Sequence, residues 1–237
     1  MKSRACEPWG FTLLELLVTI GIIAILAALL FPALVASKNK TRRTVCLSNV
    51  HQINLAARTY AEDSGDAITF PPPGLFDSWF GCGIKQIIKS YAGLKGQASP
   101  SERLFICPAD TFYYNGHFFS QGLCEQPATG FSSYAFNGGN ADTNLTAVPS
   151  IPGMSGKRLG SVRAPSKTAL VFEVAAAVPF SWHKPQKMSD DYRFQDSMNI
   201  LSYVDGHVSF TKMYFDGQHE AWLYNPPENY DYRWSAD

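Results

Sequence analysis

The chain has 237 residues, and its 20 basic and 20 acidic side chains give a formal net charge of zero at pH 7. This balance argues against the strongly basic class of nucleic-acid-binding domains, and it implies no highly charged partner. About 175 residues follow the amino-terminal helical pattern, which is enough for one globular domain with its own core.

The first element in the chain is predicted to be a membrane-spanning helix. Residues 16–36 form a run of 21 residues without a charge. At a rise of about 1.5 Å per residue, this run matches the ~30 Å hydrocarbon core of a bilayer. A single span in lipid must satisfy its own backbone hydrogen bonds, so it is expected to be helical. Pro32 removes one backbone donor and predicts a bend.

Two other interpretations of this segment remain open. Lys2 and Arg4 precede the apolar run, as in a cleavable signal peptide. Against a signal peptide, the run is too long and Glu15 interrupts its beginning. The second alternative is an uncleaved anchor, in which the carboxylate near the edge of the span reaches the membrane surface.

The helical pattern continues beyond the apolar run to about Ala61, and residues 62–66 supply the turn that ends it. Apolar residues recur at intervals of four, three, four and three, which places them on one face that is expected to pack on the globular domain. They are Cys46, Val50, Ile53, Ala57 and Tyr60. The other sides are expected to carry Arg42, Arg43, Asn49, Gln52 and Arg58.

The remainder of the chain predicts a small antiparallel sheet with long loops, because short apolar and aromatic segments alternate with Gly and Pro. One further helix is predicted at residues 84–94. Strands are predicted at residues 167–175, 198–204 and 207–214. Asp205 and Gly206 lie between the last two strands, which therefore form a hairpin.

Residues 10–15 read Gly-Phe-Thr-Leu-Leu-Glu. This segment closely resembles the processing site of type IV prepilins and type II secretion pseudopilins. The resemblance implies that a prepilin peptidase cuts between Gly10 and Phe11 and methylates the new amino group of Phe11. Glu15 then becomes the fifth residue of the mature chain, where the family uses a glutamate for filament assembly.

The resemblance also implies a domain organisation. Residues 1–10 form the leader, 11–36 the transmembrane and assembly segment, 37–62 an amphipathic helical stem, and 63–237 a periplasmic or extracellular globular domain. The expected fold class is α+β, with a long amino-terminal helix packed on a small antiparallel sheet, as in pilins.

Later segments extend the resemblance to a large pseudopilin-like group named for a histidine, nine residues, and then aspartate-glycine. The matching segments are residues 43–49, 105–110, 133–137 and 164–168. Asp205 and Gly206 match the end of the signature, but Gln195 stands where the histidine is expected. Any role of that histidine is therefore not carried over to this chain.

The function implied is that of a structural pseudopilin subunit, which stacks through residues 11–36 into a filament and helps to move folded proteins through an outer-membrane channel. The implied partners are a prepilin peptidase, further pseudopilin subunits of the same and other kinds, and an inner-membrane secretion platform. The alternative is a type IV pilin or a membrane-anchored surface module for adhesion or glycan capture. That alternative would use the aromatic loops at residues 79–80, 118–119 and 230–234.

The expected location is the bacterial inner membrane, crossed once, with the amino terminus in the cytoplasm. Lys2 and Arg4 favour this orientation, but the basic residues between 38 and 43 are more numerous and favour the reverse. The orientation therefore depends on the resemblance, because processing at Gly10 requires a cytoplasmic leader.

Four cysteines remain once Cys6 is removed with the leader: Cys46, Cys82, Cys107 and Cys124. An even number suits an oxidising compartment and allows three pairings. The preferred pair is Cys46 with Cys107, which would tie the stem to the domain; four independent thiols are the alternative. No zinc site is expected, because no two cysteines have the two-residue gap common in such sites.

No catalytic motif is recognisable, so the protein is not expected to be an enzyme. Acidic residues gather in the last third of the chain, at Glu173, Asp190, Asp191, Asp196, Asp205 and Asp216. The major pseudopilin of type II secretion holds calcium in a carboxyl-terminal loop, so the resemblance suggests a structural calcium site here. Solvated loop carboxylates are the alternative, since the spacing of an EF-hand is missing.

Overall fold

The structure is a computed structural model, and it describes residues 12–68, 84–96, 102–110, 132–138, 153–184, 193–218 and 221–237. The chain divides into two compact units, residues 1–41 and 42–237. The boundary falls inside the predicted stem, so most of the stem belongs to the globular unit. The predicted cleavage position between Gly10 and Phe11 lies outside the described residues.

Helix α1 runs from Leu13 to Asp63 and continues through Pro32. Its first half is rich in Leu, Ile and Ala, which are apolar and well suited to a helix in lipid. Residues from Leu13 to Lys40 are exposed in the isolated chain, apart from Gly21, which is half-buried. By length and composition, this half of α1 could cross a membrane.

The second half of α1 belongs to the globular unit and buries the face that the sequence predicts. Cys46, Val50, Ile53 and Ala57 have no exposed surface, and Tyr60 is half-buried. The prediction for Asn49 is wrong, because its side chain is buried rather than solvated. A buried amide is tolerated where its hydrogen-bonding groups find partners, and hydropathy alone does not reveal those partners.

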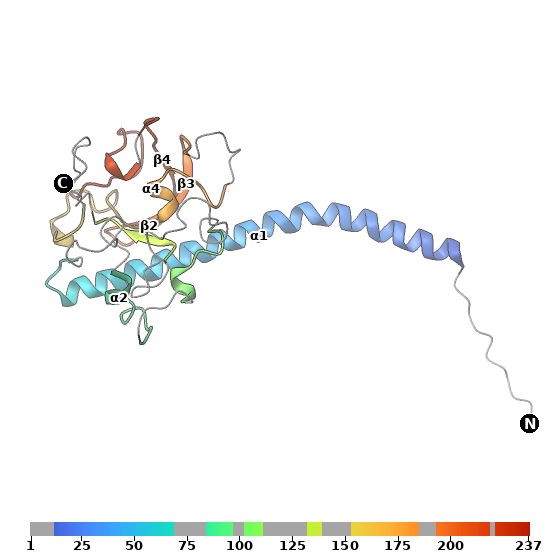
Figure 1. The fold of residues 1–237 in the computed structure, drawn as a ribbon, viewed down its shortest axis with the longest axis horizontal. Coiled ribbons are helices and arrows are strands. Elements are labelled where there is room, and N and C mark those ends of the chain that lie inside the picture. The colour runs from blue at the N-terminus through green and yellow to red at the C-terminus, as the bar shows by residue number, and fades with distance from the viewer. Residues whose placement is uncertain are drawn as a thin grey trace, which may run out of the picture. The chain divides into compact units, whose positions relative to one another are not determined.

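A four-stranded antiparallel sheet lies in the globular unit, in the order β1-β2-β3-β4 (Figure 1). Its strands are β1 (Tyr134–Phe136), β2 (Ala169–Glu173), β3 (Ser197–Tyr203) and β4 (Val208–Met213). The predicted α+β class and the three predicted strands are confirmed. The hairpin between β3 and β4 turns at Gly206, whose φ of 98° suits glycine.

Two local predictions differ from the structure, and one strand was not predicted. The predicted strand 167–175 ends at Glu173, and residues Val174–Ala177 instead form the short helix α4. The predicted helix 84–94 is only α2 (Ile84–Ile88), and turns follow up to Gly93, which has a φ of 76°. Strand β1 was missed because three residues are too few for a periodic signal.

Single turns of 3-10 helix complete the regular structure: η2 (Arg103–Phe105), η3 (Leu159–Ser161) and η4 (Ala221–Leu223).

Hydrogen bonds from buried amides fasten the stem to the sheet. Asn54 donates to Ser202 Oγ at 2.8 Å and to the carbonyl oxygen of Tyr203 at 2.9 Å. Asn49 donates to the hydroxyl oxygen of Tyr134 at 3.3 Å and to two carbonyl oxygens around η2. These contacts satisfy buried polar atoms, so the stem is part of the core of the globular unit.

The carboxyl-terminal segment also packs into this core. Arg233 forms a parallel bridge with Thr168, beside β2. The Trp234 ring lies edge-on to the Phe172 ring, with 4.8 Å between ring centroids. Asn137 donates a hydrogen bond to the carbonyl oxygen of Trp234 at 2.6 Å. The carboxyl-terminal segment is therefore held against the core beside the sheet.

Candidate functional site

The amino terminus of α1 carries the first candidate site, Glu15, in a reciprocal arrangement with Thr12. The backbone N–H of Thr12 donates to Glu15 Oε2 at 2.9 Å, and its hydroxyl donates to the same oxygen at 2.7 Å. In return, the N–H of Glu15 donates to Thr12 Oγ1 at 3.2 Å. This is a capping box, in which two otherwise unsatisfied donors of a helix start are satisfied together. The Thr-x-x-Glu signature was present in the sequence, so Thr12 could have been recognised there.

The helix surface that follows Glu15 is a candidate assembly surface. Large apolar side chains are exposed all around this half of α1, including Leu14 at 72% and Phe31 at 68% exposed. A soluble helix would bury one such face, whereas a helix apolar on all sides is normally covered by lipid or by other helices. By length and composition, this half of α1 could be covered by lipid.

A disulfide joins the stem to the segment that follows η2. The sulfur atoms of Cys46 and Cys107 are bonded, their Cα atoms are 5.3 Å apart, and 61 positions separate them in the chain. Both residues are fully buried. Around Cys107, the backbone N–H donates to Ser133 Oγ at 2.9 Å, and the Ser133 hydroxyl donates to Asp110 at 2.8 Å. Cys82 and Cys124 lie outside the described residues.

A buried carboxylate and a buried imidazole lie against this disulfide. Glu173 Oε1 is 2.7 Å from His183 Nε2 and 3.6 Å from Cys107 Sγ, and His183 Nε2 is 3.7 Å from the same sulfur. Both side chains, Glu173 and His183, have no exposed surface. Glu173 Oε2 accepts a hydrogen bond from the N–H of Ile200 at 3.0 Å.

The electrostatic effect of this carboxylate extends to a neighbouring tyrosine. Burial, followed by the negative charge of Glu173, raises the pKa of Tyr134 well above its ordinary value. The Tyr134 hydroxyl therefore stays protonated at neutral pH and accepts the amide hydrogen bond from Asn49. Glu173 is thus a buried acidic side chain, and burying such a group is costly unless it has partners.

The ligand atoms of Cys46, Cys107, Glu173 and His183 all lie within 4.8 Å of one another. No zinc site was predicted from the sequence, and this group was missed because its members are far apart in the chain. Glu173 ends β2, and α4 follows directly, so the chain reverses and brings His183 back beside the carboxylate. We refer to these four residues as the buried cluster.

The acidic residues of the last third do not form a calcium site among the residues that the structure describes. Apart from the buried Glu173, Asp196 accepts a hydrogen bond from the Tyr230 hydroxyl, and Asp205 contacts the ring of His207. No group of three or more potential ligands includes a described aspartate. Asp190 and Asp191 lie outside the described residues.

The aromatic segment 230–234 contributes mainly to the core rather than to a binding platform. Of its three aromatic side chains, Tyr232 and Trp234 are 1% and 2% exposed, and Tyr230 alone is partly accessible. Burial and the hydrogen bond to Asp196 raise the pKa of Tyr230 to about 12. The other aromatic loops considered, residues 79–80 and 118–119, lie outside the described residues.

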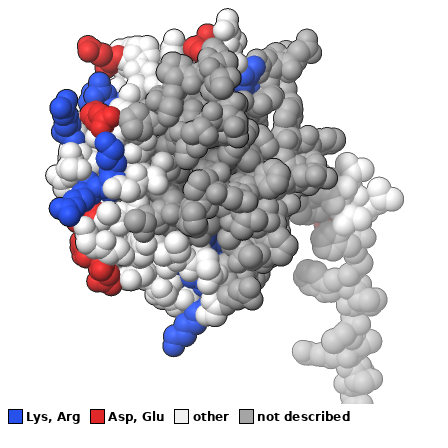
Figure 2. Space-filling view, turned by 60° about the vertical axis from the view of Figure 1, so that its left-hand side comes forward, with Lys and Arg blue, Asp and Glu red and all other residues white. Residues whose placement is uncertain are grey.

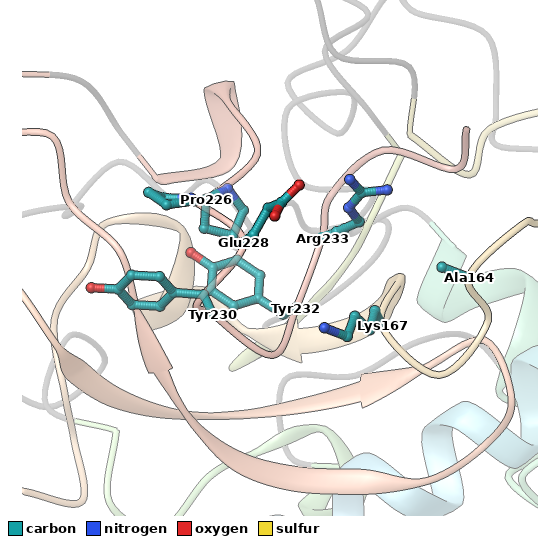
Figure 3. A pocket seen from close by; sticks show the side chains of 8 residues that line it. Ala164, Lys167, Pro226, Glu228, Tyr230, Tyr232 and Arg233 are labelled. Atoms are coloured by element: carbon teal, nitrogen blue, oxygen red, sulfur yellow. The ribbon is translucent and has the colours of Figure 1, made fainter.

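Tyr230 borders a surface pocket of about 280 Å³ between the carboxyl-terminal segment and the loop that precedes β2. Figure 3 shows Lys167 and Arg233 on one side of the pocket and Tyr230 and Tyr232 on the other. Glu228 also lines the pocket, so charges of both signs surround it.

Gln195, which stands where the resemblance led us to expect a histidine, also contacts this aromatic region. Its side-chain amide donates to the Tyr230 hydroxyl and accepts from the N–H of Phe215. Gln195 therefore fastens a turn before β3 to the chain end.

Acidic and basic side chains alternate on the described part of the face in Figure 2. Neither sign gathers into a patch there, in keeping with the zero net charge of the chain.

No protein-family model, curated protein or solved structure matches this chain.

Proposed function

We propose that this protein is a pilin-like structural subunit of a type II secretion-like filament, anchored and assembled through residues 11–36. The observation that carries the proposal is an exposed apolar helix with a single carboxylate, Glu15, in its first turn. The globular unit has a buried core of its own, and the side chains of this apolar half of α1 are exposed in the isolated chain. Such a subunit needs lipid before assembly and neighbouring helices after it.

The chemistry proposed for Glu15 is charge compensation between subunits. Cleavage after Gly10 leaves a cationic amine on Phe11, and the carboxylate of a neighbouring subunit compensates it when both enter the apolar filament core. Breaking such a buried pair by removing one partner costs about 3–5 kcal/mol. The capping contact with Thr12 does not prevent this, because a carboxylate has about four acceptor positions.

Maturation by a prepilin peptidase and assembly with further subunits on an inner-membrane platform complete the proposal. The single-pass topology has the amino terminus in the cytoplasm and the globular unit on the other side. The buried stem supports this role, because residues 46–61 hold the globular unit to the same helix that enters the filament.

Substitutions at Glu15 separate its charge from its capping role. Gln serves in a capping box as Glu does, whereas Ala does not. We expect Glu15→Gln and Glu15→Ala to be processed normally, with N-methyl-phenylalanine at the mature terminus by mass spectrometry, and to be depleted from filaments to a similar extent. Thr12→Ala removes the hydroxyl of the cap and keeps the charge, so it should assemble nearly as well as the unmodified protein.

Filament incorporation can be measured by crosslinking in cells followed by sedimentation of sheared filaments. If Glu15→Gln assembles normally and only Glu15→Ala and Thr12→Ala fail, Glu15 acts as a helix cap and the charge-compensation mechanism is wrong. If the mature protein retains Met1 in cells that contain the peptidase, the proposed function fails as a whole.

A further inference from the structure

We propose that the buried cluster binds one zinc ion when Cys46 and Cys107 are in the dithiol form. This site is independent of the proposed function, because it lies within the globular unit and involves no residue of the membrane segment. The ligands are two thiolates, the Nε2 atom of His183 and the Oε1 atom of Glu173. Sulfur, imidazole nitrogen and carboxylate oxygen are the donors that Zn²⁺ takes in proteins, and structural sites use four of them.

The arrangement of the ligand atoms fits a tetrahedral ion. Zinc–ligand distances of about 2.0–2.3 Å give tetrahedron edges of about 3.3–3.8 Å. Cys107 Sγ lies 3.6 Å from Glu173 Oε1 and 3.7 Å from His183 Nε2, so two edges already have this length. The 2.7 Å contact between Glu173 and His183 must widen, and the bonded sulfurs must separate. Loading therefore requires the dithiol form and small side-chain movements.

A disulfide by itself does not explain the two polar groups. Its sulfurs need no polar companions in an apolar core, yet a carboxylate and an imidazole with no exposed surface both lie against Cys107. Burying such a pair carries a desolvation penalty that its own attraction often fails to repay. A divalent cation compensates the carboxylate and two thiolates together, so all four groups have a chemical role in the zinc form.

The support around the ligands is also suited to a fixed site. The N–H of Ile200 donates a hydrogen bond to the second carboxylate oxygen of Glu173, and the N–H of Cys107 donates one to Ser133 Oγ. Outer contacts of this kind orient ligands and strengthen metal binding. The four ligands come from the stem, the segment after η2, the end of β2 and the loop after α4, so one ion would cross-link four parts of the unit.

The conversion between the two forms can be written as balanced steps. A phosphine reductant takes an oxygen atom from water and becomes a phosphine oxide, while two electrons and two protons pass to the disulfide and give two thiols. Zn²⁺ then displaces both thiol protons to solvent and binds the thiolates, the imidazole and the carboxylate. A disulfide compound reverses the change: it takes two electrons from the thiolates and two protons from solvent, becomes two thiols, and leaves the protein disulfide and the free ion.

The test uses the full chain in mild detergent, with Cys6→Ser, Cys82→Ser and Cys124→Ser introduced so that only the cluster cysteines can bind metal. Oxidised and phosphine-reduced samples receive one equivalent of Zn²⁺, are desalted, and are measured by plasma mass spectrometry. We expect about one zinc per reduced chain and none per oxidised chain. Co²⁺ in place of Zn²⁺ should show the visible absorption of a tetrahedral ion with thiolate ligands.

His183→Ala and Glu173→Gln distinguish this site from adventitious thiol binding. Loss of a residue that only supports a metal ligand lowers metal affinity by roughly 10- to 100-fold. Each of these variants should lower zinc affinity by more than that, as measured by competition with a chromophoric chelator. The oxidised form of each variant serves as the folding control, because its disulfide does not depend on the metal. Equal zinc affinity in reduced His183→Ala and in the unmodified cluster, or no zinc in the reduced chain, overturns the proposal.

Discussion

Breaking the cross-link between Cys46 and Cys107 should destabilise the globular unit by a predictable amount. The perturbation is chemical reduction of the chain carrying Cys6→Ser, Cys82→Ser and Cys124→Ser, in the presence of EDTA so that no metal replaces the disulfide. Reduction keeps both sulfur atoms in the core, so it removes the cross-link without creating a cavity. The double variant Cys46→Ala/Cys107→Ala adds a cavity and provides the comparison.

The magnitude follows from the length of chain that the disulfide closes. For a separation of 61 positions, the chain-entropy relation gives a loss of about 4 kcal/mol in the free energy of unfolding at 25 °C. Domains of this size are stable by only about 5–15 kcal/mol, so the change is a large fraction of the total. With an m value of roughly 2–3 kcal/mol/M, the urea midpoint should fall by about 1.3–2 M.

Tryptophan fluorescence of the full chain in detergent measures this transition, because Trp182, Trp222 and Trp234 are buried in the globular unit. The double alanine variant should lose more than the reduced protein, since large-to-small changes in a core add a cavity term. A midpoint that shifts by less than about 0.3 M on reduction would refute the argument that this cross-link restrains the unfolded chain.

Two further predictions concern the stem and the chain end. Ile53 is 0% exposed, so Ile53→Ala should lower the free energy of unfolding in urea by about 2–5 kcal/mol. Leu55 is 58% exposed, so the control Leu55→Ala should change the free energy of unfolding by less than about 0.5 kcal/mol. Equal effects would show that the stem is not docked through the predicted face. The pKa of Tyr230 in the folded protein is raised from 10.0 to about 12. The protonated Tyr230 hydroxyl therefore contributes to the free energy of unfolding in full below pH 10, and this contribution is lost as the pH rises through 12. In an absorbance titration of tyrosine ionisation, Tyr230→Phe should remove one step near pH 12, and Asp196→Asn should move that step toward pH 10. An unchanged titration in both variants would contradict the raised pKa of Tyr230.

Local patterns predicted the elements that are long and periodic. The stem face containing Val50 and Ile53 follows from helical spacing alone, and the hairpin at Gly206 follows from turn chemistry between two apolar runs. Shorter elements escaped, because β1 and α4 have three and four residues and owe their conformation to neighbours. Asn49 was misplaced for a related reason, since only the folded chain supplies the acceptors that make its burial tolerable.

The apolar helix with its isolated carboxylate was determined by the sequence, because residues within one helix need no distant partner to set their length, spacing and polarity. The buried cluster was decided only by the tertiary structure. In the sequence, Glu173 is one of several acidic residues in the last third, and His183 is one of several scattered histidines. Their chemistry arises because the sheet and α4 bring them to the sulfurs of Cys46 and Cys107, and a contact between residues so far apart in the chain leaves no local pattern.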